Sequence, residues 1–322
     1  MSVSEYCEIT LDVFLNMTGQ LPFDVYIQLT PEKFTKLFKR GDDTDKGRFE
    51  NYAKKGAEKL YIHRNDRRDY IGATERLIRK MVGSQKFMPK DAYRALEELS
   101  EQTLFEIFED KIFDEESVYR AQDTIRSYVQ VLKNDAGVLG QFIQLAKNET
   151  YMVRHSIAAA VFALLLGRAA QNTNEKLLEI IGTGALLHDI GMSALPSNIN
   201  ELDRKLTGPE WKAVKEHPDL GLKMTESLKN FPPEIYQVIA QHQESYDGTG
   251  YPKQLRAEEI YYPARIVAVA DCFSALTTRR GGRSLFSPSE ALALMQSERL
   301  KFDPTLMTAF TKLLSPKKRR VA

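Results

Sequence analysis

From Arg67 to its C-terminus, this 322-residue chain carries apolar residues at helical spacing and no stretch in which apolar and polar residues alternate as in a strand. Apolar residues that recur every three or four positions favour a helix with one buried face. One such stripe consists of Val118, Ala121, Ile125, Val129 and Leu132. We interpret it as a packing face inside the chain, with a helical connector that also forms a homodimer as the alternative. Most of the chain is therefore predicted to be helical.

The first 65 or so residues differ, because they mix strand-like alternation with short helical patterns. Apolar and polar residues alternate in residues 8–15 and 23–29, and a third short strand is expected at residues 60–64. Two segments that end in glycine, residues 30–41 and 48–56, are predicted to be helices. The predicted fold class is a multidomain α/β plus all-α protein, in which a small N-terminal α/β module precedes an all-helical bundle.

The length of the chain corresponds to about two domains of roughly 150 residues each. We predict a small α/β module of unknown role over residues 1–70, a helical connector over residues 71–145 and a helical domain over residues 146–322. In the helical domain, a capping box at Thr207 and the Asp303-Pro pair mark the starts of two helices.

Composition and charge exclude several classes of protein. The net charge of +1 gives no overall attraction to nucleic acid or to an anionic membrane surface. Cys7 and Cys272 are the two cysteines of the chain, which is typical of a reducing compartment. The N-terminus lacks the basic and apolar regions of a signal peptide, and the longest uncharged stretch, residues 155–167, is shorter than the roughly 20 apolar residues of a membrane span. We therefore expect a cytoplasmic protein without a membrane span or a nucleic-acid partner.

Histidine and aspartate residues in the helical half point to a metal site. Four of the five histidines are His155, His188, His217 and His242. Asp189 follows His188 at the end of an apolar segment, so the two side chains diverge by about 100° and could share one metal while the carboxylate reaches a second. Asp271 lies in the apolar run VAVADCF, where a buried carboxylate needs a cation or hydrogen bonds. Histidine and carboxylate ligands without cysteine suit Fe, Mn, Zn or Ni.

Four sequence motifs follow one another in this half: LLHDIGMSALP, HPDLGLKM, HQESYDGTGYP and VADCFSALTTRRGGR. In this order and at these separations they resemble the HD-GYP family of metal-dependent phosphodiesterases, which degrade cyclic di-GMP. An HD dipeptide alone would carry little information, whereas the ordered set is highly specific. The resemblance covers roughly residues 145 to 315 and implies that residues 146–322 form an HD-GYP-like metal-binding domain.

The resemblance implies a binuclear metal centre. The residues that would hold the first ion are His155, His188, Asp189 and Asp271. The residues that would hold the second ion are Asp189 as the bridging ligand, His217, His242 and Gln243. Iron is the expected metal, with Mn, Zn and Ni as alternatives, and His188 and Asp189 are the implied catalytic pair. A water activated between the two divalent ions would attack phosphorus and give pGpG and/or GMP.

The resemblance also implies substrate contacts and partners. Arg280 and Arg283 match basic positions that hold the phosphates or guanine of the ligand. Asp247, Gly250 and Tyr251 match a loop at the lip of the site, where glycine permits a tight backbone path. The implied ligand is cyclic di-GMP or a related cyclic dinucleotide. The implied protein partners, such as GGDEF-type cyclases, would bind through this loop or through the N-terminal module.

Five positions depart from the family pattern: Tyr151, Met192, Gln243, Ser274 and Gly282. Gln243 replaces a histidine, and its amide is a weaker ligand than imidazole, so the second ion should bind less tightly. Met192 replaces a lysine that would approach the scissile phosphate, and loss of one such cation costs about 10²- to 10³-fold in rate. Tyr151 replaces a glutamate that a third metal would need.

These departures keep two alternatives open. Gln243 and Met192 motivate a catalytically weak or inactive metal-bound receptor or scaffold that binds a cyclic dinucleotide and signals through protein partners. The other alternative is hydrolysis of a different nucleotide, because HD chemistry is not limited to cyclic dinucleotides.

Overall fold

The computed structural model describes residues 5–57, 59–82, 87, 89–134, 151–170, 174–196, 199, 204–278 and 285–315. The chain divides into two compact units, which are described separately below. Unit 1 comprises Met1–Thr103 and Gln130–Val138, and unit 2 comprises Leu104–Val129 and Leu139–Ala322.

Two long helices, α4 (Pro89–Phe108) and α5 (Glu115–Asn134), contribute residues to both units. The five apolar residues of the predicted stripe lie on α5, and all of them are buried within the chain. Their burial agrees with the interpretation of the stripe as an internal packing face.

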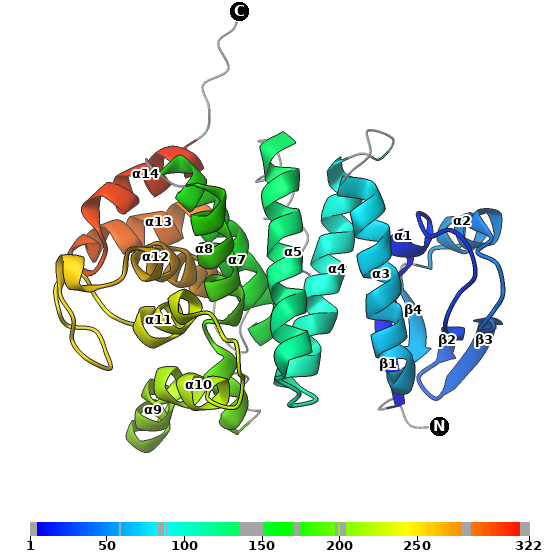
Figure 1. Cartoon of the computed structure of the whole chain (residues 1–322), viewed down its shortest axis with the longest axis horizontal. Coiled ribbons are helices and arrows are strands. Elements are labelled where there is room, and N and C mark those ends of the chain that lie inside the picture. Colours follow the sequence, from blue (N-terminus) through cyan, green and yellow to red (C-terminus); the bar gives the residue numbers. More distant parts are fainter. Residues whose placement is uncertain are drawn as a thin grey trace, which may run out of the picture. The chain divides into compact units, whose positions relative to one another are not determined.

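Unit 1 is built on a four-stranded antiparallel sheet, drawn in blue in Figure 1. Its strands are β1 (Tyr6–Thr10), β2 (Val25–Thr30), β3 (Lys33–Phe38) and β4 (Lys59–His63). Their spatial order is β1-β4-β2-β3, and every neighbouring pair is antiparallel. The other elements of this unit are α1 (Leu11–Phe14), α2 (Lys46–Lys54), the 3₁₀ helix η2 (Arg64–Asp66) and α3 (Arg67–Val82).

The predicted strands at residues 23–29 and 60–64 and the predicted helix at residues 48–56 are confirmed as β2, β4 and α2. The predicted strand over residues 8–15 is wrong in its second half, because β1 ends at Thr10 and α1 follows. Three neighbouring apolar residues of α1 are buried, which one helical turn permits and a strand, with successive side chains on opposite faces, does not.

The helix predicted over residues 30–41 is wrong, because β3 occupies this segment. β3 pairs with β2 across a two-residue turn at Pro31 and Glu32. Phe34 on β3 stacks on Tyr6 with 4.1 Å between the ring centroids. The apolar spacing of the segment fits a helix as well as a strand, and contacts across the sheet decide between them.

The described secondary structure of unit 2 is helical, without strands. Besides parts of α4 and α5, its α-helices are α7 (Tyr151–Ala169), α8 (Glu175–Leu187), α9 (Gly208–Lys215), α10 (His217–Thr225), α11 (Pro233–Gln241), α12 (Tyr262–Thr277), α13 (Pro288–Ser297) and α14 (Pro304–Leu314). Its 3₁₀ helices are η4 (Ile190–Ala194), η6 (Ala257–Glu259) and η7 (Arg299–Lys301). Helix α7 packs against α8, α12 and α14 and forms the centre of this bundle (Figure 1). The α/β module followed by helices confirms the predicted fold class.

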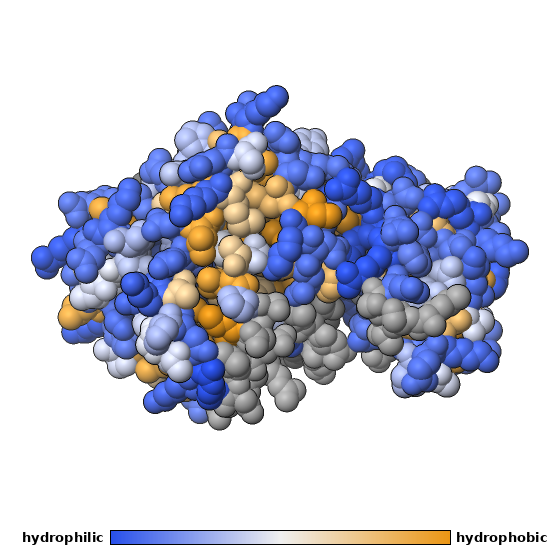
Figure 2. Space-filling view, turned by 90° about the horizontal axis from the view of Figure 1, so that it is seen from below, coloured by the Kyte–Doolittle hydropathy of each residue, from blue (hydrophilic) through white to orange (hydrophobic). Residues whose placement is uncertain are grey.

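Among the described helices, α7 is the one whose length and composition would allow it to cross a membrane. In the structure, 72% of its apolar stretch is buried inside the fold. The central helix of a bundle needs the same apolar composition, because neighbouring helices surround it. The face of the molecule in Figure 2 is mostly hydrophilic, with hydrophobic side chains gathered near its middle.

Two predicted helix starts are confirmed. Thr207 and Glu210 form a capping box at the start of α9, in which each side chain bonds the backbone N–H of the other. Asp303 accepts hydrogen bonds from the first backbone N–H groups of α14. These caps begin α9 and α14 at the residues where the sequence placed them.

Candidate metal centre

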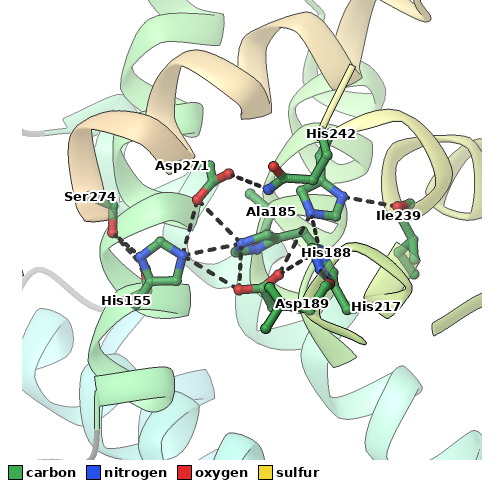
Figure 3. Close-up of polar contacts among 11 residues, drawn as sticks. His155, Ala185, His188, Asp189, His217, Ile239, His242, Asp271 and Ser274 are labelled. Atoms are coloured by element: carbon green, nitrogen blue, oxygen red, sulfur yellow. Dashed lines mark hydrogen bonds and ion pairs between the residues drawn. The ribbon is translucent and has the colours of Figure 1, made fainter. Parts of the chain in front are cut away.

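Six side chains from five helical segments of unit 2 converge on one buried point, as Figure 3 shows. His155 on α7 and Asp271 on α12 face each other from within their helices. The other four side chains come from helix ends. They are His188 and Asp189 after α8, His217 at the start of α10 and His242 after α11.

The turn after α8 passes α10 in direct backbone contact at Gly191. A Cβ atom on Gly191 would lie 1.9 Å from the carbonyl oxygen of His217 and 2.5 Å from the backbone nitrogen of Gly221. Only glycine permits this approach. The contact therefore fixes the separation between Asp189, which precedes the turn, and His217.

The first group of donor atoms belongs to His155, His188, Asp271 and one oxygen of Asp189. His155 Nε2 lies 3.1 Å from Asp271 Oδ1 and 3.3 Å from His188 Nε2. His188 Nε2 lies 3.3 Å from Asp189 Oδ2. The ligand atoms of His155, His188 and Asp271 all lie within 4.8 Å of one another, a spacing that one metal ion can span.

The second group belongs to His217, His242 and the other oxygen of Asp189. The Nε2 atoms of the two histidines lie 3.2 Å and 3.6 Å from Asp189 Oδ1, and 2.9 Å from each other. Because its two oxygens face the two groups, Asp189 lies where a carboxylate that bridges two ions would lie.

Hydrogen bonds fix the same tautomer on all four histidines. In His188, His217 and His242, Nδ1 lies 2.7 Å, 2.7 Å and 2.9 Å from the backbone carbonyl oxygen three residues earlier, so Nδ1 must carry the proton. In His155, Nδ1 lies 2.9 Å from Ser274 Oγ, which donates its own proton to the carbonyl oxygen of His155. In the neutral form of each ring, Nε2 is therefore the atom that offers a lone pair, and in all four histidines it faces the centre.

This arrangement of four Nε2 atoms and two carboxylates fits bound cations. Two pairs of Nε2 atoms lie 2.9 Å and 3.3 Å apart. Between two neutral imidazoles such contacts repel, so each pair needs a proton or a metal ion between its nitrogens. The four imidazoles are at most 3% exposed, so bulk water does not screen them. Imidazole and carboxylate donors without thiolate suit divalent transition-metal ions.

The pKa shifts show that the centre favours positive charge. Burial alone would raise the pKa values of Asp189 and Asp271, but the surrounding histidines hold both below the usual range. Burial lowers the pKa of His217 to about 4, so its imidazole is neutral at pH 7. Burial also lowers the pKa of His188, but the two carboxylates raise it well above its usual value. The ionised carboxylates and the neutral imidazole of His217 are in the forms that ligate metals, and a metal ion would displace the proton that the two carboxylates favour on His188.

Gln243, predicted as a ligand of the second ion, makes a hydrogen bond to a side chain of the first group. Its Nε2 donates to Asp271 Oδ2 at 3.0 Å, while Asp271 Oδ1 faces the first group. The structure thus places the Gln243 amide beside a carboxylate of the first group. A hydrogen bond to one oxygen of the Asp271 carboxylate fixes the orientation of the other oxygen, which faces the first group.

Gln243→Ala is expected to weaken binding of the first ion by about 10- to 100-fold, because loss of a partner that orients a ligand typically costs this much. Competition with a chromophoric chelator measures both affinities. Gln237→Ala, at an exposed position on α11, the helix that precedes Gln243, is the control and should leave both ions unchanged. Selective loss of the second ion would instead show that the Gln243 amide ligates it.

The loop after His242 is held by Glu244, which is 4% exposed. Its two carboxylate oxygens accept hydrogen bonds from the backbone N–H groups of Lys253 and Leu255 at 2.7 Å and 3.0 Å. A Cβ atom on Gly250 would lie 2.2 Å from a backbone nitrogen, so glycine is required there as well. The Tyr251–Pro252 peptide bond in the same loop is cis. Glu244 therefore closes the loop that the sequence motif predicts as the lip of the site.

Glu244→Ala leaves two backbone N–H groups without their acceptor and should destabilise the protein by about 2 kcal/mol. Chemical denaturation measures this change. Glu226→Ala, at an exposed position after α10, is the matched control and should stay within about 0.5 kcal/mol of the unmodified protein. Equal stability of the two variants would contradict the role of Glu244.

The predicted substrate-binding residues are placed only in part. Tyr251 lies against His217, with 6.3 Å between ring centroids and an interplanar angle of 89°. Asp247 bonds within the loop, where it accepts from the backbone N–H and the hydroxyl of Thr249. Arg280 and Arg283 lie outside the described residues, as does Gly282.

Two of the departures from the family pattern have clear surroundings. Met192 is 8% exposed and packs in an apolar cluster with Ile199 and Val214. Tyr151 stacks on His155, with 5.3 Å between ring centroids and 9° between planes. Neither side chain adds a charge to the centre.

Two residues that support the site, Ser274 at the centre and Glu244 in the loop, carried only weak indications in the sequence. Ser274 follows Asp271 by three positions on α12, a spacing that puts both on one helix face, but a serine there is common without a partner. Glu244 directly follows Gln243, and nothing local shows that it turns away from the metals to bind the loop.

The helical half of the chain is similar to known proteins. Residues 141–306 match the family described as HD domain. Cyclic di-GMP phosphodiesterase PA4108 of Pseudomonas aeruginosa is 33% identical over 182 residues, which are 56% of this chain and 44% of that protein. Cyclic di-GMP phosphodiesterase response regulator RpfG of Xanthomonas campestris is 36% identical over 161 residues, or 49% and 41% of the two chains. The 3'3'-cGAMP-specific phosphodiesterase 3 of Vibrio cholerae is 31% identical over 166 residues, or 51% and 36%. The chain spans less than half the length of each of these relatives.

One solved structure is similar over nearly the whole chain. Bd1817, a HDG"Y"P protein from Bdellovibrio bacteriovorus, has a TM-score of 0.71 and covers 96% of this chain and 99% of its own at 22% identity, which shows the fold. A helical bundle with a buried histidine and aspartate centre defines a metal-binding protein of the HD type. The chain belongs to the HD domain family, which confirms the family expected from its four motifs. HD domains bind divalent metal ions, and two sets of side chains in this structure could hold one: His155, His188 and Asp271, and His188, Asp189 and His242.

Proposed function

We propose that this chain is a two-metal phosphodiesterase that hydrolyses cyclic di-GMP to pGpG and/or GMP. The observation that carries the proposal is the pair of histidine groups whose Nε2 lone pairs face the two oxygens of Asp189. The names of the relatives add support, because each is a phosphodiesterase of a cyclic dinucleotide and two are named for cyclic di-GMP.

The residues of the chain supply orientation and charge. When bound, two divalent ions would neutralise the phosphoryl oxygens and lower the pKa of a water between them. We propose iron, with Mn, Zn and Ni as alternatives, and we assign the catalytic pair to His188 and Asp189. Asp189 holds the two groups in register, and the Nδ1 hydrogen bonds keep each imidazole aimed at the centre. Burial strengthens these electrostatic interactions, because little water screens them.

Two residues favour a second candidate, a catalytically weak or inactive receptor or scaffold for a cyclic dinucleotide. Met192 is buried among apolar side chains and brings no charge to the scissile phosphate. Gln243 bonds Asp271, which leaves three candidate protein ligands in the second group where the first has four. A centre that lacks one metal-ligating side chain and one positively charged side chain would bind the cyclic dinucleotide and hydrolyse it slowly.

The test is incubation of purified protein, loaded with Mn(II) or anaerobically with Fe(II), with cyclic di-GMP and with 3'3'-cGAMP. Product analysis by chromatography should give pGpG or GMP from the first compound. Binding of cyclic di-GMP in calorimetry without product would support the receptor. Cleavage of 3'3'-cGAMP in preference would reassign the substrate, and absence of both binding and product would overturn both candidates.

We also propose the division into a module over residues 1–70, a connector over residues 71–145 and a metal-binding domain over residues 146–322. The loop around Tyr251 and the N-terminal module are proposed surfaces for protein partners, GGDEF-type cyclases among them, and the chain is proposed to act in the cytoplasm, without a nucleic-acid partner and with a homodimer as one form.

A further inference from the structure

A lysine without an acidic partner lies close to the second group of donor atoms. The Lys215 ammonium, at the end of α9, lies 5.7 Å from the centre of the Trp211 ring and 5.4 Å from the centre of the Tyr251 ring. In the part of the chain that the structure describes, no carboxylate lies within ion-pair distance of this ammonium. The two rings hold it by cation–π attraction, which leaves its N–H groups available to an anion.

Tyr251 connects this lysine to the metal centre. The Lys215 ammonium lies over the Tyr251 ring. The same ring is perpendicular to the ring of His217, whose Nε2 lies 3.2 Å from Asp189 Oδ1. Burial, followed by the charges of Asp189 and Asp271, raises the pKa of the Tyr251 hydroxyl. Lys215 is therefore separated from the second donor group by one tyrosine ring.

The position of Lys215 matches the charge of a cyclic dinucleotide. Such a ligand carries two phosphodiesters with one negative charge each, and a pair of metal ions acts on the one that is cleaved. The other phosphodiester then needs a separate cation at the rim. Lysine binds phosphate as a point charge, without the planar geometry that arginine imposes.

We infer that Lys215, positioned by Trp211 and Tyr251, binds the phosphodiester of the substrate that is not cleaved. The inference rests on the proposed function, because it takes a cyclic dinucleotide as the ligand. It assigns Lys215 to substrate binding and Trp211 to positioning. Since Trp211 is the single tryptophan of the chain and is 48% exposed, the tryptophan fluorescence of the protein comes from this subsite.

The first experiment compares two substrates. Lys215→Gln in the metal-loaded protein should lower kcat/KM for cyclic di-GMP by about tenfold or more, chiefly through KM, as expected for loss of one charge-assisted bond. It should leave kcat/KM for bis(4-nitrophenyl) phosphate, which has a single phosphodiester, unchanged. Lys215→Arg should restore most of the loss, and Lys212→Gln, an exposed lysine one turn earlier on the same helix, should have no effect.

The second experiment needs no turnover. Titration of the metal-loaded protein with a hydrolysis-resistant phosphorothioate analogue of cyclic di-GMP should change the Trp211 fluorescence saturably, with a midpoint about tenfold higher in Lys215→Gln than in Lys212→Gln. Equal midpoints, or an equal loss of kcat/KM on both substrates, would overturn the inference and leave the proposed function intact. A saturable titration without hydrolysis of cyclic di-GMP would contradict the proposed enzymatic activity, while a higher midpoint in Lys215→Gln would still support the role of Lys215 in binding. Absence of any binding would remove both.

Discussion

Replacement of Asp189 by asparagine is expected to have the largest effect of any single change, because this carboxylate faces both donor groups. Its two oxygens lie 3.3 Å from His188 Nε2 and 3.2 Å from His217 Nε2. Asparagine keeps the shape but removes the charge and one of the two acceptors. Hydrolysis of cyclic di-GMP should fall by at least about 10³-fold, beyond the range for loss of a single preorganised group. Metal content should fall below one ion per chain.

Asp219→Asn is the matched control for this change. Asp219 lies on α10, two residues after His217, and its side chain is exposed. The substitution should alter neither the metal content nor the rate. Two tightly bound ions in Asp189→Asn would show that the carboxylate does not bridge the centre, whatever the effect on rate.

Gly191→Ala is expected to have the largest effect on stability. The added Cβ would lie 1.9 Å from the carbonyl oxygen of His217, a backbone atom that cannot move without α10. Overpacking of this severity should cost about 3 kcal/mol or more in the free energy of unfolding. It should also weaken metal binding, since His217 belongs to the second group. Urea denaturation of the metal-free protein measures the first effect and metal titration the second.

Gly208→Ala makes the same chemical change at a position where the added methyl group meets nothing within 4 Å. Gly208 is the first residue of α9, so alanine should be neutral or stabilise by up to about 1 kcal/mol. If Gly191→Ala were as stable as Gly208→Ala, the close contact between the turn and α10 would not hold the centre together.

The fold could be predicted from the sequence where the spacing of the apolar residues fitted a helix but not a strand, or a strand but not a helix. The helices of unit 2 follow from apolar spacing and from caps such as Thr207 and Asp303. The segment of residues 30–41 could not be predicted in this way, because its apolar residues fit both periods. Only pairing with β2 and the stacking of Phe34 on Tyr6 select a strand, and both are long-range contacts.

The residues at the metal centre were predictable because of their chemistry. Buried histidines and aspartates in apolar helices need a cation, and the structure brings the six predicted imidazole and carboxylate side chains together. The direction of a side chain at a helix end was not predictable. Gln243 follows His242 directly, yet its amide turns toward Asp271 on another helix. The role of Ser274 likewise depends on α12 packing against α7, which no local pattern specifies.

The central claim is that Asp189 joins two histidine groups into one binuclear centre. Titration of metal-free protein with Mn(II), followed by electron paramagnetic resonance, tests it most directly. The account predicts two ions per chain and, at saturation, the spectrum of an exchange-coupled pair, since one carboxylate would bridge both ions. A single ion per chain, or two ions with independent spectra, would contradict it.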